Sequence, residues 1–230
     1  MIERRGRLKE PDARQIFSKL VLATKKAHDA GVVLRNIKPE AVQVQKNPAD
    51  GSLDVWVADL RCAILVADVG DEDDVLIGLH GTPEYSAPEE VIWYWAMLEP
   101  PQMDEPPPPY GRKVDLWALG MCLHVMLAGC FPFDSSLDDE AMLREVCLAA
   151  FSFGDPGWAK LSADALDLVQ QLLQRDPNER PYLEEVLQHP FCASTVSDAI
   201  NVARANSAKL ADRDLDAALE ALDMGDDDDE

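Results

Sequence analysis

Residues 114–127 read VDLWALGMCLHVML, and this stretch decides the fold because it is apolar on nearly every face at helical spacing. A helix with one face in water carries polar residues there, whereas a helix that is apolar all round lies inside a domain. The stretch therefore predicts a buried central helix, and the other elements are expected to pack around it.

Helical patterns lie on both sides of this stretch. On the N-terminal side, Pro11 suits the first turn of a helix, apolar residues then recur at helical spacing, and Gly31 ends the pattern. On the C-terminal side, helices are expected near residues 138–149, 163–173 and 183–188. Most of the chain is thus predicted to be helical.

One segment has the periodicity of strands. Apolar and polar residues alternate at 42–44 and again at 53–57, on either side of a turn at Asn47–Gly51, which is typical of a β-hairpin. The proline-rich, acidic segment Pro100–Pro109 is expected to be an exposed loop. The predicted fold class is mainly α: a helical bundle around a buried central helix, with one small β-hairpin.

Composition excludes several classes of function. The 230 residues include 21 basic and 43 acidic side chains, for a formal net charge of -22, which repels nucleic acid and anionic membrane surfaces. Five cysteines without a C-x-x-C pair and four scattered histidines give no disulfide framework or zinc site. No apolar run approaches the roughly 20 residues of a membrane span. A reducing compartment, cytoplasmic or nuclear, is expected.

Several short segments resemble, in order, the signature motifs of protein kinases. Residues 33–41 (VLRNIKPEA) are similar to the catalytic loop V-H-R-D-L-K-P-E-N, and 58–61 (ADLR) to the D-F-G segment. The others are 81–89 (GTPEYSAPE), 115–120 (DLWALG), 176–181 (DPNERP) and 189–191 (HPF). Residues 1–192 resemble the C-terminal lobe of a Ser/Thr kinase of the calcium/calmodulin-dependent group. Residues 193–230 are then an acidic, partly helical tail, and the N-lobe is expected to be absent.

The resemblance implies structural roles for four residues. Glu89 and Arg180 would form a buried ion pair, and Asp115 would accept hydrogen bonds from the backbone of the catalytic loop. Arg35 would face a phosphorylated activation loop, yet residues 63–80 contain no Ser, Thr or Tyr. Either the acidic run Asp71–Asp74 replaces the phosphate beside Arg35, or it is a solvated loop.

The resemblance also assigns the positions that carry the chemistry. Lys38 and Thr82 fit the Ser/Thr branch, and Asp59 would ligate magnesium. Asn36 stands where the family has the aspartate that accepts the substrate proton, and Ala41 stands where it has a metal-binding asparagine. An amide is a very poor base, and an alanine side chain offers no oxygen.

These losses predict a pseudokinase-like interaction or regulatory module that is catalytically impaired and binds a protein partner. The alternative is a truncated record of an active Ser/Thr kinase that transfers phosphate from ATP to proteins. No cofactor is expected for the chain alone, and ATP with Mg²⁺ is implied only if an N-lobe exists. Calmodulin is not expected as a partner, because its target helices are basic and this tail is acidic.

Overall fold

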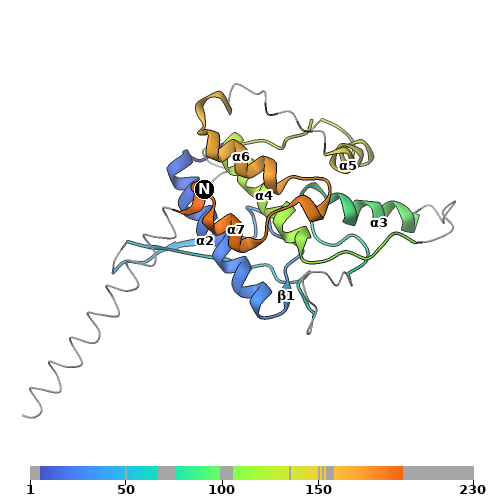
Figure 1. Cartoon of the computed structure of the whole chain (residues 1–230), viewed down its shortest axis with the longest axis horizontal. Coiled ribbons are helices and arrows are strands. Elements are labelled where there is room, and N and C mark those ends of the chain that lie inside the picture. Colours follow the sequence, from blue (N-terminus) through green and yellow to red (C-terminus); the bar gives the residue numbers. More distant parts are fainter. Residues whose placement is uncertain are drawn as a thin grey trace, which may run out of the picture.

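The apolar stretch forms α4, Lys113–Ala128, which lies in the middle of the molecule (Figure 1). The computed structural model describes residues 6–49, 51–66, 76–98, 106–134, 136–149, 151, 153 and 158–193. Every residue from Val114 to Leu127 is buried. The helix ends at Ala128, and the φ of 81° at the following Gly129 lies in the left-handed region that favours glycine after a helix.

Helix α6, Ala163–Leu172, packs directly against α4. Their close approach depends on Gly120 of α4, because a Cβ at this position would lie only 2.8 Å from the Cβ of Leu172. Ser162 begins α6, and its hydroxyl oxygen accepts a hydrogen bond from the Ala165 amide at 3.2 Å. This cap satisfies one of the amides that the first turn of a helix leaves free.

Helix α2, Glu10–Asp29, covers α4 with its apolar face and also contacts α7, Leu183–Gln188. The end of the described chain is fixed to α2 as well. The ring of Phe191 packs edge-on against Phe17 with ring centres 6.2 Å apart. Arg14 donates hydrogen bonds to the carbonyl oxygens of Pro190 and Phe191 at 3.0 and 2.7 Å. These contacts join the first and last described parts of the domain.

Helices α3, Pro88–Leu98, and α5, Asp139–Leu148, lie against each other at the right of Figure 1. Helix α3 was not among the helices predicted from the sequence. Short 3-10 turns are η1 at Pro83–Tyr85, η2 at Trp158–Lys160 and η3 at Pro177–Glu179.

The strands form two separate sheets of two antiparallel strands each. In one, β2, Val42–Lys46, pairs with β3, Leu53–Val57. In the other, β1, Val32–Val33, pairs with β4, Ile64–Leu65. The prediction of a helical bundle with one small hairpin is therefore wrong. Strands of two residues are too short to show alternation, so periodicity could not predict the second sheet.

Some predicted features lie outside the described residues. These are the acidic run at 71–74, most of the segment 100–109 and the tail beyond residue 193. Among the residues that the structure describes, no helix combines the length and the apolar character needed to cross a membrane.

A buried ion pair joins α3 to the C-terminal part of the domain. Both guanidinium Nη atoms of Arg180 bind the Glu89 carboxylate, at 2.7 and 2.8 Å. The Arg180 side chain is fully buried and that of Glu89 is 15% exposed. Arg180 also donates to the carbonyl oxygens of Gln174, Lys113 and Arg175. The donors of Arg180 are therefore satisfied inside the protein. Removing Glu89 would leave the buried guanidinium without its counter-charge.

We expect Glu89→Ala to lower the free energy of unfolding by about 3–5 kcal/mol, because it leaves a buried guanidinium without its counter-charge. Urea denaturation followed by circular dichroism measures this. The control is Glu140→Ala, which breaks the exposed pair between Glu140 and Arg144 and should change stability by no more than about 0.5 kcal/mol. Equal effects of the two substitutions would contradict a structural role for Glu89.

Candidate functional site

The loop after β1 is held by the carboxylate of Asp115, in the first turn of α4. Its Oδ1 accepts a hydrogen bond from the amide of Arg35 at 2.8 Å, and its Oδ2 accepts one from the amide of Leu34 at 2.8 Å. His28 of α2 lies 2.8 Å from the same Oδ2. Asp115 is fully buried, so these three donors replace the water that the carboxylate has lost. The histidine had not been singled out from the sequence.

This clamp holds Arg35 in an uncommon backbone conformation. Its φ of 54° is in the left-handed region, which a residue with a Cβ adopts only when its surroundings require it. The Arg35 side chain donates from Nε to the carbonyl oxygen of Cys62 at 2.8 Å, just before β4. The pairing of Arg35 with the acidic run stays a prediction, because that run lies outside the described residues.

Directly after this bend, four of the predicted site residues come together. The Asn36 side chain accepts a hydrogen bond from the Thr82 hydroxyl at 3.0 Å and donates one to Asp59 Oδ2 at 3.2 Å. Lys38 donates to the same Thr82 oxygen at 2.5 Å. Asn36 is only 6% exposed. Its amide thus has both a donor and an acceptor role inside the protein.

The chain can reach this arrangement only with glycine before Thr82. Gly81 has a φ of 87°, and a Cβ there would lie 2.4 Å from the Arg35 carbonyl oxygen. A substituted residue would therefore clash with the backbone of the facing loop. The glycine brings the segment of residues 81–82 into contact with the loop that carries Asn36.

The site also contains an ion pair within one loop, between Arg61 and Asp59. Arg61 donates from Nε to Asp59 Oδ1 and from its Nη atom to Oδ2, both at 2.8 Å. The Arg61 amide also donates to Oδ1 at 3.2 Å. These hydrogen bonds from the Arg61 side chain and backbone hold the pKa of Asp59 far below its usual range. The Arg61 side chain is 87% exposed, and its head group binds Asp59.

The residues present do not fit a magnesium site of the family type. Both oxygens of Asp59 already bind the Arg61 guanidinium. Ala41, at the other ligand position, is 3% exposed and has no side-chain oxygen. Among the described residues, no group of three His, Cys, Asp or Glu side chains is placed to hold a metal ion.

The structure pairs Glu89 with Arg180, as described above. Their neighbour Glu90 was not identified from the sequence, although it is more unusual. It is 3% exposed, Oε2 accepts a hydrogen bond from the Ala87 amide at 2.9 Å, and Oε1 has no hydrogen-bond partner. Burial raises the pKa of Glu90 well above its usual value, and the charges of Glu89 and Asp115 add to this. The only signal in the sequence is a second acid directly after Glu89.

A model of the protein kinase domain matches residues 1–192. The chain belongs to the protein kinase family. This match treats residues 1–192 as a protein kinase domain and does not single out one lobe. Together with the second sheet, it overturns the predicted fold class of a C-lobe with the N-lobe absent.

Curated kinases show the same relationship. The chain is 30% identical over 200 residues to the DNA damage response protein kinase DUN1 of Saccharomyces cerevisiae, covering 83% of this chain and 36% of that protein. It is 34% identical over 183 residues to the serine/threonine-protein kinase DCLK3 of Mus musculus, covering 79% and 20%. For calcium/calmodulin-dependent protein kinase type 1B of Rattus norvegicus the identity is 32% over 192 residues, covering 82% and 48%. This chain thus spans between a fifth and a half of the length of these relatives.

We expect Arg61→Gln to raise the pKa of Asp59 toward the ordinary aspartate value of about 3.9, because the guanidinium that stabilises the carboxylate is gone. Carbon-13 NMR titration of the carboxyl groups measures this. Asp134 is the internal control, because hydrogen bonds from Ser136 lower the pKa of that residue and it should titrate unchanged. An Asp59 pKa that does not move in the variant would show that Arg61 does not hold this carboxylate.

We expect Glu90→Gln to flatten the pH dependence of stability above pH 5. The pKa of Glu90 is higher in the folded state than in the unfolded state, where it is about 4.3. Glu90 therefore contributes its full share to the free energy of unfolding below pH 4.3, and this contribution is lost as the pH rises through the folded-state pKa. Compared with the variant, the natural chain should therefore lose stability in urea unfolding as the pH rises above about 5.

Glu184→Gln is the matched control for that measurement. A hydrogen bond from Lys25 holds the pKa of Glu184 below its usual value. Its contribution is therefore present above the unfolded pKa and lost as the pH falls through the folded pKa, which is the opposite sign. If Glu90→Gln and Glu184→Gln changed the pH profile in the same direction, Glu90 would not be a buried acid with a raised pKa.

Proposed function

We propose that this member of the protein kinase family is a pseudokinase, which binds a protein partner and does not transfer phosphate at a useful rate. One observation carries the proposal: Asn36, at the position of the proton acceptor, uses its amide to bind Thr82 and Asp59. In phosphoryl transfer by kinases, an aspartate at this position accepts the proton of the substrate hydroxyl. The loss of such general-base help usually costs about 10²–10⁴ in rate.

The charges around Asn36 support the same proposal. ATP and Mg²⁺ are what the family usually uses, and in that reaction the metal neutralises charge that develops on the phosphates. Here Asp59 is neutralised by Arg61 instead, and Ala41 offers no second ligand. Lys38 retains a cation beside Thr82, but a single lysine replaces neither the base nor the metal.

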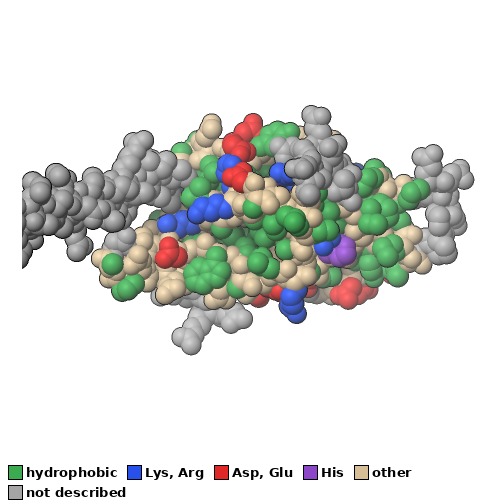
Figure 2. Space-filling view, turned by 90° about the horizontal axis from the view of Figure 1, so that it is seen from below, with side chains coloured by type: hydrophobic (Ala, Val, Ile, Leu, Met, Phe, Trp, Pro, Cys, Tyr) green, Lys and Arg blue, Asp and Glu red, His purple; other side chains and the backbone are tan. Residues whose placement is uncertain are grey.

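A role in binding is supported by apolar side chains that the fold leaves exposed. Near the candidate site, Leu60 is 55% exposed and Leu65 is 68% exposed, and at the end of α3 Met97 is 71% exposed. Figure 2 shows hydrophobic side chains spread over one face of the molecule, with charged side chains among them. Apolar surface of this kind is typical of sites that bind another protein. The acidic balance of the chain argues against nucleic acid as that partner.

The second candidate function is Ser/Thr protein kinase activity, of which this chain would be one part. Three observations favour kinase activity. The chain belongs to the protein kinase family, it retains Lys38 and Asp59, and it spans only part of the length of its relatives. In that case Asp59 would have to exchange Arg61 for a metal ion before the reaction.

We expect the full chain to transfer no phosphate from ATP to a mixed peptide library above background, with either Mg²⁺ or Mn²⁺. The assay compares the natural chain with Asp59→Asn and with Asp54→Asn, a change of the same type on β3. All three proteins should give the same background rate, because no residue of the site acts as base. Transfer that is lost in Asp59→Asn and kept in Asp54→Asn would establish the kinase and overturn the pseudokinase.

A further inference from the structure

Four consecutive prolines, Pro106–Pro109, follow α3 and lead toward α4. Proline fixes φ at about −65°, and a residue that precedes a proline is driven away from the helical region. Both constraints act at Pro106, Pro107 and Pro108, and together they favour the polyproline II conformation. As expected, the structure has neither helix nor strand at these four residues.

The exposure of the four prolines follows the three-residue repeat of this conformation. Residues three apart in polyproline II lie on the same face, about 9 Å apart at 3.1 Å per residue. Pro106 and Pro109 are such a pair, and both are exposed. Pro107 is buried, while Pro108 is exposed as well. The fold therefore presents three of the four prolines to solvent, and we call Pro106, Pro108 and Pro109 the proline ridge.

The proline ridge is fixed to the domain by its neighbours. Trp93 of α3 donates a hydrogen bond from its indole Nε1 to the carbonyl oxygen of Pro108 at 2.9 Å. Tyr110 pairs with Leu76 through two backbone hydrogen bonds of 2.8 and 2.9 Å, and its hydroxyl donates to the Gly78 carbonyl oxygen at 2.7 Å. Because the ridge is held in place before a partner arrives, binding costs little conformational entropy.

The chemistry of the proline ridge selects the kind of partner. Proline has no N–H, so these residues cannot add as a strand to the edge of another sheet. What they offer is apolar rings and carbonyl oxygens. Within the described part of the chain, no hydrogen bond reaches the carbonyl oxygens of Pro106, Pro107 and Pro109. Tryptophan and tyrosine match both features, because their rings pack on apolar surface while the indole N–H or phenol O–H donates. Trp93 already binds the fourth carbonyl in this way.

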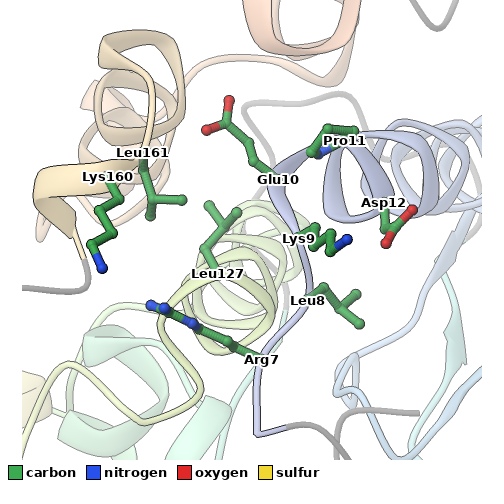
Figure 3. Close-up of a pocket in the computed structure, with 9 residues that line it drawn as sticks. All are labelled: Arg7, Leu8, Lys9, Glu10, Pro11, Asp12, Leu127, Lys160 and Leu161. Carbon is green, nitrogen blue, oxygen red and sulfur yellow. The ribbon is translucent and has the colours of Figure 1, made fainter.

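A pocket of about 660 Å³ at the beginning of α2 offers less apolar surface to a protein partner (Figure 3). Leu127 in its wall has no exposed surface, and Leu8 is buried as well. Glu10 accepts hydrogen bonds from the hydroxyl and the amide of Ser162. The exposed residues of the wall are mostly charged: Arg7, Lys9, Pro11, Asp12 and Lys160. The proline ridge, in contrast, is apolar throughout.

We propose that the proline ridge docks a partner domain with an aromatic-lined groove that binds polyproline II helices, as SH3, WW and EVH1 domains do. Aromatic side chains of the groove pack on Pro106 and Pro109, and a donor from the groove binds one of the carbonyl oxygens. Tyr110 is 2% exposed, so it stays in the domain and takes no part in the contact. The inference names a class of partner for the pseudokinase proposed above, and it rests on that function only in that the chain acts by binding.

The test is a panel of purified SH3, WW and EVH1 domains on a solid support, probed with the fluorescently labelled full chain. We expect at least one of these domains to bind. For that domain, replacing both Pro106→Ala and Pro109→Ala should raise the dissociation constant roughly tenfold or more in calorimetric titration, because two ring contacts and the fixed conformation are lost. The control is Pro48→Ala, which changes an exposed proline in the turn between β2 and β3 and should leave the dissociation constant unchanged.

A free peptide of four prolines, capped at both ends, keeps the test decisive if the double variant does not fold. It should displace the natural chain from the same domain. The docking site is overturned if no domain of the panel binds, if the double variant binds as tightly as the natural chain, or if the peptide does not compete. A chain that transfers phosphate from ATP and still binds the domain through Pro106 and Pro109 would overturn the pseudokinase and leave the docking site in place.

Discussion

The structure depends on one buried carboxylate. Asp115 has no exposed surface, and it joins the central helix α4 to His28 of α2 and to the amides of Leu34 and Arg35. A carboxylate without such donors would be too costly to bury, so the loop can take no other path while α4 stays in the core. Its place in the first turn of a helix also favours its negative charge. The left-handed bend at Arg35 follows from this clamp, and it directs Asn36 toward Thr82 and Asp59.

The hydrogen bonds of Asp115 fix the backbone of the site. They do not determine which side chains stand at the catalytic positions. An aspartate at position 36 would bring a second carboxylate next to Asp59, where the two charges would repel each other unless a cation lay between them. Asn36 removes that repulsion by donating to Asp59 at 3.2 Å, and Arg61 neutralises what charge remains. With those two changes in place, the absence of an oxygen ligand at Ala41 costs the fold nothing. The three departures from the family pattern therefore form one consistent arrangement, balanced within the chain.

The elements that could be predicted are those whose hydrophobic pattern lies within one continuous segment of the sequence. The apolar run 114–127 and the alternation at 42–57 correspond to α4 and to the hairpin of β2 and β3. The pairing of β1 with β4 could not be predicted, because each strand has two residues and they are more than 30 positions apart. The contact of Asn36 with Thr82 spans 46 positions, and only the kinase resemblance placed the two in one site. Arg61 is two residues from Asp59, yet the backbone angles of their loop decide that they meet, and spacing does not give those angles.

The acidic balance of the chain explains how its buried acids are treated. A net charge of -22 makes every uncompensated carboxylate in the interior more costly, since the rest of the molecule repels it. Three buried or nearly buried acids lie around α3 and α4, and each is compensated in a different way. Asp115 has three donors, Glu89 has the guanidinium of Arg180, and Glu90 has a single amide. Glu90 lies beside both of the others, so a proton is the one compensation left to it, which agrees with the raised pKa of that residue. The acids that are fully paired hold the scaffold, and the acid that is not makes the stability of that scaffold depend on pH.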